Sequence, residues 1–215
     1  MDSTTFAKEM QSQVTDFCAA YESTLPAYSY VPLTDDGMRV KVMKNRLWNE
    51  VRAAEVLGTW LKTTPEMDVK KALAGAIYEE FEHADLLSAV LADRGESPYD
   101  TPGLPAQVAM FNAFEVLGTT VERMAAFPLA GEGVAVFMIQ KSLSSESVPR
   151  WVSEPYEAIQ ADEQDHGSYP AQVLAKYAVT EAQQDSVRRA VAMSLTLRRE
   201  YFANLDRWVY DDKPW

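Results

Sequence analysis

The chain has only two histidines, and each follows a glutamate by three residues in a segment whose apolar residues recur at helical spacing. Glu80 precedes His83, and Glu163 precedes His166. A spacing of three residues places both side chains on one face of a helix. Burying an unpaired carboxylate is costly, so such an inward-facing pair needs a partner, and divalent cations supply one. The pattern therefore favours helices that meet around metal ions.

Helical spacing dominates the whole chain, whereas alternating β-branched runs and Asn-Gly or Asp-Gly hairpin turns are scarce. The sequence therefore predicts an all-α fold in one domain, residues 1–215, with a metal-binding four-helix bundle over about 40–180 and extra N- and C-terminal helices. The expected helices cover about residues 3–24, 38–62, 65–93, 106–127, 132–146 (a shorter helix or a linker), 149–177 and 180–209.

A short internal repeat suggests where two further ligands lie. The segments AEVLGT (54–59) and FEVLGT (114–119) share five consecutive residues, and each precedes a Glu-x-x-His helix. We therefore expect Glu55 and Glu115 to complete the series Glu, Glu-x-x-His, Glu, Glu-x-x-His on four helices. That ligand set is typical of di-iron and di-manganese carboxylate bundles. Mixed oxygen and nitrogen ligands suit iron or manganese and leave positions open for dioxygen or substrate.

Other acidic residues near these positions leave alternatives open. Glu50 lies five residues before Glu55 and off its helix face, so the repeat favours Glu55. Glu122 follows Glu115 by two helical turns and is a candidate additional ligand or a supporting group. Histidine ligands usually donate their second N–H to a carboxylate. The acidic residue before each motif glutamate suits this role across the pair, Asp162 for His83 and Glu79 for His166.

Small and hydroxylated residues near the expected ligands predict an oxygen or substrate pocket. Gly58 and Gly118 each follow a repeat glutamate by three residues and leave room beside metals or permit close helix packing. Thr119 follows Glu115 by four residues, which places a hydroxyl on the oxygen-binding side. Phe114 is a candidate for the pocket wall, although aromatic residues at helical spacing usually belong to the core.

The chain resembles the ferritin-like di-iron carboxylate superfamily over about residues 40–180. The segments AEVLGTWLKTTPEMDVKKALAGAIYEEFEHADLLSAVLADRG and ADEQDHGSYPAQVLAKY resemble the catalytic subunits of phenylacetyl-CoA epoxidase, which also place a Glu-x-(Ile/Leu)-Gly helix before a Glu-x-x-His helix. This chain is shorter than those subunits, so their substrate is not implied. The resemblance implies oxygen activation by reduced di-iron, bridging Glu80 and Glu163, and terminal Glu55, Glu115, His83 and His166.

The expected function is that of an oxygen-dependent non-haem di-iron oxidoreductase of the monooxygenase or hydroxylase type, acting on a small organic substrate. It would use two iron ions, with manganese or a mixed pair as alternatives, and take electrons from a reductase or ferredoxin. A peroxidase or ferroxidase of the rubrerythrin or ferritin type is a second hypothesis. A scaffold subunit of a larger oxygenase is a third, although such subunits tend to lose ligands.

Composition limits the partners and the compartment. The formal charge of −12 and the pI of about 4.6 disfavour binding to nucleic acid or anionic lipid. The single cysteine, Cys18, fits a reducing compartment and excludes a cysteine-cluster metal site. We see neither a signal-peptide pattern nor an apolar run long enough for a bilayer, which predicts a cytoplasmic protein without membrane contact. A homodimer is expected from the many apolar residues.

Overall fold

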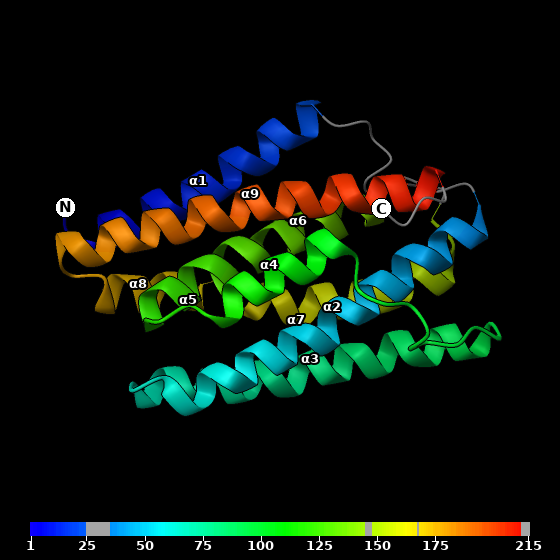
Figure 1. Ribbon diagram of the computed structural model, residues 1–215, viewed down its shortest axis with the longest axis horizontal. Coiled ribbons are helices and arrows are strands. Elements are labelled where there is room, and N and C mark those ends of the chain that lie inside the picture. The colour runs from blue at the N-terminus through cyan, green and yellow to red at the C-terminus, as the bar shows by residue number, and fades with distance from the viewer. Residues whose placement is uncertain (25–34, 145–147, 167, 212–215) are drawn as a thin grey trace.

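The computed structural model describes residues 1–24, 35–144, 148–166 and 168–211, without the side chains of residues 22–24, 164–166 and 211. Every regular element in these ranges is helical, so the prediction of an all-α fold is confirmed (Figure 1). The elements are α1 (Ser3–Thr24), α2 (Asp36–Thr63), α3 (Met67–Asp93), α4 (Pro105–Glu115), α5 (Thr120–Met124), the π-helical turn η2 (Ala125–Gly131), α6 (Glu132–Leu143), α7 (Arg150–His166), α8 (Tyr169–Tyr177) and α9 (Glu181–Asp211).

The helices form three layers (Figure 1). The long α2–α3 hairpin lies along one side, and α1 and α9 lie along the other, with α4 to α8 between them. Among the helices of the described segments, none combines the length and the apolarity that crossing a bilayer requires. The buried acidic residues described below lie where the α2–α3 layer meets α6 and α7 of the middle layer.

The expected helix over 106–127 is interrupted in the structure. Helix α4 ends at Glu115, and a new helical run begins at Thr120 and continues through α5, η2 and α6 to Leu143. The break has a local cause, because Thr119 and Glu122 form a capping box at the start of α5. The Thr119 hydroxyl accepts from the Glu122 amide at 3.3 Å, and the Glu122 carboxylate accepts from the Thr119 amide at 3.1 Å. Residues 132–143 are therefore a full helix of the bundle, not a linker.

The π-helical turn η2 lies where this helical run meets the core. It contains Pro128, which has no amide hydrogen and disfavours regular α-helical bonding around it. Such turns are rare, and they occur mostly as local insertions near functional sites. Phe127 packs at 5.6 Å on Phe114 and at 5.9 Å on Phe111. These aromatic contacts fix η2 directly before Glu132, the first residue of α6.

The expected helix over 149–177 also appears as two pieces. Helix α7 ends at His166 and α8 begins at Tyr169, with Pro170 in its first turn, where a missing amide costs nothing. Two apolar clusters hold these pieces: a large one between α1, α4, η2 and α9, and a smaller one that includes Leu87, Ile139 and Ile159. The smaller cluster joins α3, α6 and α7 beside the polar interior.

Replacing Thr119 by Ala is expected to lower the free energy of unfolding by ~1 kcal/mol, the usual value of a helix N-cap. Thr119→Ser keeps the hydroxyl acceptor and serves as the matched control. Both variants are expected to keep the wild-type metal content, because the capping box lies apart from the carboxylate cluster described below. Urea unfolding of the two variants measures the difference. An unchanged midpoint for Thr119→Ala would contradict the capping role.

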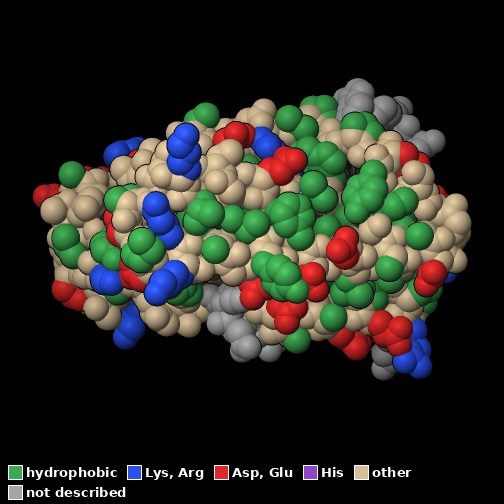
Figure 2. Space-filling model, turned by 90° about the horizontal axis from the view of Figure 1, so that it is seen from below, with side chains coloured by type: hydrophobic (Ala, Val, Ile, Leu, Met, Phe, Trp, Pro, Cys, Tyr) green, Lys and Arg blue, Asp and Glu red, His purple; other side chains and the backbone are tan. Residues whose placement is uncertain are grey.

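The outer face of α3 carries exposed apolar side chains, among them Tyr78 and Phe81, with 63% and 46% of their surface exposed. Figure 2 views the molecule from the side on which α3 lies, and hydrophobic side chains gather along its middle with acidic ones near them. The Lys and Arg side chains on this face lie mainly toward one end. The expected homodimer stays a prediction, as does the absence of a nucleic-acid partner.

Candidate metal centre

The middle of the molecule holds a cluster of acidic side chains and one histidine. Two groups of three are close enough to hold a metal ion, one of Glu50, Glu80 and His83 and the other of Glu80, Glu132 and Glu163. Within each group the candidate ligand atoms all lie within 4.8 Å of one another. Glu80 belongs to both groups. The geometry therefore resembles two adjacent cation sites that share one carboxylate.

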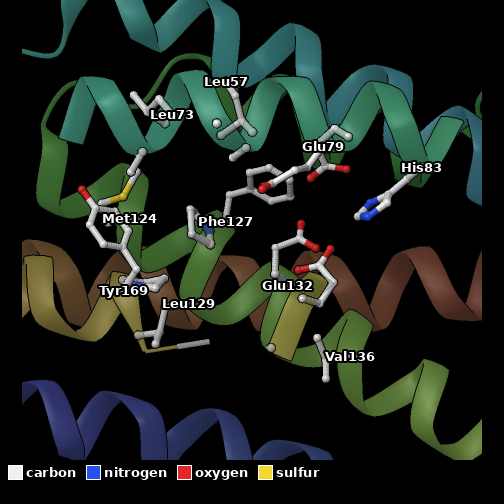
Figure 3. A pocket seen from close by; sticks show the side chains of 18 residues that line it. Leu57, Leu73, Glu79, His83, Met124, Phe127, Leu129, Glu132, Val136 and Tyr169 are labelled. Atoms are coloured by element: carbon white, nitrogen blue, oxygen red, sulfur yellow. The ribbon is translucent and has the colours of Figure 1, made fainter. Parts of the chain in front are cut away.

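Four helices bring these residues together from distant parts of the chain. Helix α2 carries Glu50, α3 carries Glu80 and His83, α6 begins with Glu132, and α7 carries Glu163. All of them except the half-buried Glu132 are at least nine-tenths buried. Figure 3 shows Glu132 and His83 pointing toward one another from opposite walls of a cavity.

Several atoms of the cluster have no hydrogen-bond partner among the described residues. Nδ1 of His83 and Oε2 of Glu80 are buried and have no hydrogen-bond partner among the described residues. Burial, followed by the charges of Glu50 and Glu132, raises the pKa of Glu80 well above its ordinary value. The same causes, burial first, raise the pKa of Glu163 to about 9. Unpartnered atoms and mutually repelling carboxylates are the features that a bound cation would relieve, so the donor set fits metal ions.

The second ring nitrogen of His83 has the carboxylate partner that the sequence spacing predicts. Nε2 of His83 lies 3.3 Å from Oδ2 of Asp162 on α7. With a hydrogen on Nε2 donated to Asp162, the Nδ1 lone pair is available to a metal. Asp162 therefore orients the imidazole without entering the cluster.

Two largely shielded arginines, Arg46 and Arg198, lie near the carboxylates of the cluster. Arg46 forms an ion pair with Glu50 one helical turn later. Burial alone would lower the pKa of Arg46, but the surrounding carboxylates, Glu50 above all, raise it. Burial lowers the pKa of Arg198 on α9, although the charge of Glu132 acts in the opposite sense. These cations offset part of the negative charge that the four carboxylates concentrate.

A cavity of about 570 Å³ opens beside the carboxylates. Glu80, Glu132 and Glu163 line one part of it, and most of the remaining wall is apolar (Figure 3). Helix α3 forms one wall, and η2 and the start of α6 form the other. Gly75 of α3, which lines the cavity, is exposed to solvent. A cavity of this size with convergent polar groups at one end is typical of a small-molecule site.

The two repeat glutamates lie outside this cluster, which corrects the expected ligand set. The side chains of Glu55 and Glu115 are 53% and 35% exposed. Both bind Arg52: Nη1 of Arg52 lies 3.0 Å from Glu55, and Nη2 is paired with Glu115. A separation of five residues turns Glu55 about 140° around α2 from Glu50. Glu50 and Glu132 occupy the places that the repeat assigned to Glu55 and Glu115.

The other predicted pocket residues are also placed elsewhere. Gly58 and Gly118 are exposed, and a Cβ added at either would meet no described atom within 4 Å, so neither leaves room for a metal or a close helix. Thr119 and Glu122 are used by the capping box. Phe114 is fully buried in the aromatic core and does not line the cavity, although it packs on Phe127, which does.

Two expectations concern residues at the end of α7. His166 is the last residue of that helix, three after Glu163, but its side chain lies outside the described residues. The expected contact between His166 and Glu79 therefore stays a prediction. Glu79 itself is half-buried and lines the cavity beside Glu80.

The sequence contains a signal for each of the two candidate ligands that the repeat did not predict, Glu50 and Glu132. Glu50 follows Leu47 by three residues and precedes Ala54 by four, which is the spacing of the buried face of α2. Glu132 is the only charged residue between Arg123 and Lys141, inside the apolar run MAAFPLAGEGVAVFMIQ. A charge within so apolar a helix indicates a buried role. The internal repeat favours Glu55 and Glu115 instead.

Comparison with known proteins supports the fold. No known family model and no curated protein matches the sequence. The solved structures include a domain of unknown function with a heme oxygenase-like fold from Shewanella denitrificans, with a TM-score of 0.76 over 93% of this chain and 91% of that one at 14% identity. The chain has the heme oxygenase-like all-α fold. The resemblance to phenylacetyl-CoA epoxidase subunits rests on sequence motifs alone.

Proposed function

We propose that the protein is an oxygen-dependent non-haem di-iron oxidoreductase that oxidises a small organic substrate. The observation that supports this most is the pair of candidate cation sites sharing Glu80 at one end of an apolar cavity. Oxygen insertion into a C–H bond consumes one dioxygen, two electrons and two protons, and it yields the alcohol and one water. A reduced reductase or ferredoxin would supply the electrons.

Each residue of the centre has a separate task in this proposal. Glu50, Glu80, His83, Glu132 and Glu163 would hold the ions, with His166 as the expected sixth ligand. When bound, two reduced irons supply electrons and open coordination positions for dioxygen. Asp162 keeps the proton on Nε2 of His83, and Arg46 orients Glu50. The apolar wall excludes water and places a substrate C–H bond near the carboxylates.

The proposal is tested by oxygen consumption in a single turnover. Protein loaded without oxygen with two Fe(II) per chain is expected to take up about one dioxygen for every two irons. Glu80→Ala is expected to take up none, whereas Glu82→Ala, on the exposed face of the same helix, serves as the control. No uptake by the loaded wild type would contradict an oxygen-activating centre.

The same experiment separates the oxygenase from a ferroxidase. A ferroxidase passes iron through its site, so oxygen uptake would continue as more Fe(II) is added. The apolar lining of the cavity favours an organic occupant over an iron path, because moving ions require polar walls. We therefore expect uptake to stop once the bound pair is oxidised. Continued uptake in proportion to added iron would favour the ferritin-type alternative.

A further inference from the structure

A second, smaller pocket lies between α2, α6, α7 and α9, and its charge is opposite to that of the cavity beside the carboxylates. Its volume is about 60 Å³. Arg46 and Arg198 line it, and none of its described lining residues is Asp or Glu. In a chain with a formal charge of −12, two guanidinium groups around a pocket without a carboxylate in its described wall favour a negatively charged occupant.

The neutral polar groups of this pocket are mostly bonded to one another or to the backbone. The Asn49 amide donates to the Tyr201 hydroxyl at 3.0 Å, and that hydroxyl donates to Oδ1 of Asn45 at 2.5 Å. The Ser142 hydroxyl donates to the Met138 carbonyl at 3.0 Å. These groups therefore shape the wall, and the two arginines remain as its charged donors.

Arg198 lies in this pocket without an ion-pair partner among the described residues. It is 4% exposed, and its shielded Nε has no described hydrogen-bond partner. Its terminal nitrogens, Nη1 and Nη2, bond no described acceptor either, but unlike Nε they keep accessible surface, so an ion in the pocket can reach them. Arg46 uses Nε for its ion pair with Glu50, so its terminal nitrogens are also available.

The size of the pocket limits the class of anion. At the ~30 Å³ that a water fills in the liquid, 60 Å³ holds about two waters or one halide ion. A sugar acid or a nucleotide is too large. A guanidinium group is weakly hydrated and always charged, which suits it to binding an anion in a shielded place.

We propose that this pocket binds one small monovalent anion, such as chloride, between Arg46 and Arg198, and that the anion strengthens metal binding by the carboxylates. The coupling to metal rests on the proposed function. Without metal, the carboxylates offset part of the charge of the two arginines. Two bound divalent ions would neutralise the four carboxylates and leave the guanidinium charges without compensation, which is costly in a shielded place. Anion and metal then favour one another reciprocally.

The first test locates the anion. Crystals of metal-free and iron-loaded protein are soaked in sodium bromide, because the anomalous scattering of bromide identifies its position. We expect bromide between Arg46 and Arg198 in both forms of the wild type, with higher occupancy in the loaded form. Arg198→Met removes the charge and should lose the ion, whereas Arg198→Lys keeps the charge and should retain it if the Met variant fails to fold. Arg199→Met, at an exposed position of the same helix, is the matched control and should match wild type.

The second test measures the coupling. Fe(II) affinity is determined without oxygen in sodium chloride and in sodium gluconate at equal ionic strength, because gluconate is too large for the pocket. We expect chloride to tighten Fe(II) binding by at least about fivefold in wild type and in Arg199→Met, the lower end of usual coupling between sites. Arg198→Met should bind Fe(II) alike in the two salts.

The possible failures are distinct. No bromide in the pocket of either wild-type form, or equal bromide in Arg198→Met, which would show an adventitious ion only, overturns the anion site. Equal Fe(II) affinity of wild type in the two salts overturns the coupling. If the protein takes up no iron, the proposed function and the coupling fail together, and the metal-free crystals still decide whether the anion site exists.

Discussion

Glu132→Ala is expected to lose most of the bound iron, whereas Glu115→Ala keeps the wild-type amount. Glu132 lies in the carboxylate cluster with Glu80 and Glu163, but Glu115 pairs with Arg52 outside it. Loss of a direct ligand should weaken metal affinity by more than the ~10–100-fold typical of removing an outer hydrogen-bond partner. Elemental analysis of the two purified variants, loaded side by side, measures the difference.

A second pair of variants repeats this comparison on α2. Glu50→Ala is expected to lose iron and Glu55→Ala to keep it, since Glu50 is buried in the cluster and Glu55 is mostly exposed. Circular dichroism checks that each variant folds. Iron loss in the Glu55 and Glu115 variants, with retention in the Glu50 and Glu132 variants, would restore the ligand set of the internal repeat.

Metal-free protein is expected to lose stability as the pH rises from about 4.5 to about 9. The unfolded chain releases the Glu163 proton near 4.5, whereas the folded metal-free chain holds it to about 9. Between these values Glu163 holds one more proton in the folded state, which lowers the free energy of unfolding by up to ~1.4 kcal/mol per pH unit, and the raised pKa of Glu80 adds to this loss. Above about 9 Glu163 is ionised in both states, and its share of the loss is complete.

Glu163→Gln is expected to remove the Glu163 share of this pH dependence, leaving that of Glu80, and to stabilise the metal-free protein at pH 7 by ~1–3 kcal/mol. Glu157→Gln, at an exposed position of the same helix, is the matched control and should behave as wild type. Bound metal keeps the carboxylates ionised and compensated, so the loaded wild type should lose the fall in stability. Urea unfolding across this pH range measures it, and a flat profile for metal-free wild type would contradict the buried-carboxylate account.

The general fold was predictable because helical spacing is a local property. The spans 3–24 and 180–209 match α1 and α9 within two residues. The break between α4 and α5 was also locally encoded, since Thr119 and Glu122 have the Thr-x-x-Glu spacing of a capping box. The sequence-based prediction instead gave both residues a role in the metal site, and it therefore expected one continuous helix over 106–127.

The candidate site was predictable only in part, for a geometric reason. The spacing of Glu80 and His83 within one helix specifies a shared face, so the pair could be found without knowing the fold. Glu132 reaches the cluster because α5, η2 and α6 run on as one helical segment, which depends on tertiary packing. An added Cβ at Gly131 would lie 2.9 Å from the Phe127 ring and 3.0 Å from Arg198. That close packing beside Glu132 involves α9, a contact invisible in sequence spacing.

The internal repeat misled because similar sequence need not occupy similar structure. The first copy lies within α2, whereas the second spans the end of α4 and the break before α5. The two glutamates are nevertheless close in space, because Arg52 forms an ion pair with each of them, Glu55 and Glu115. The repeat therefore marks a contact between α2 and α4 rather than a pair of metal ligands.

Iron content combined with electron paramagnetic resonance of the oxidised, loaded wild type tests the central claim most directly. Two cation sites that share Glu80 predict about two irons per chain, coupled closely enough that the ferric pair gives no signal of isolated high-spin iron. About one iron per chain with a strong isolated ferric signal would contradict a shared-carboxylate pair. No iron in a well-folded chain would contradict the metal centre itself.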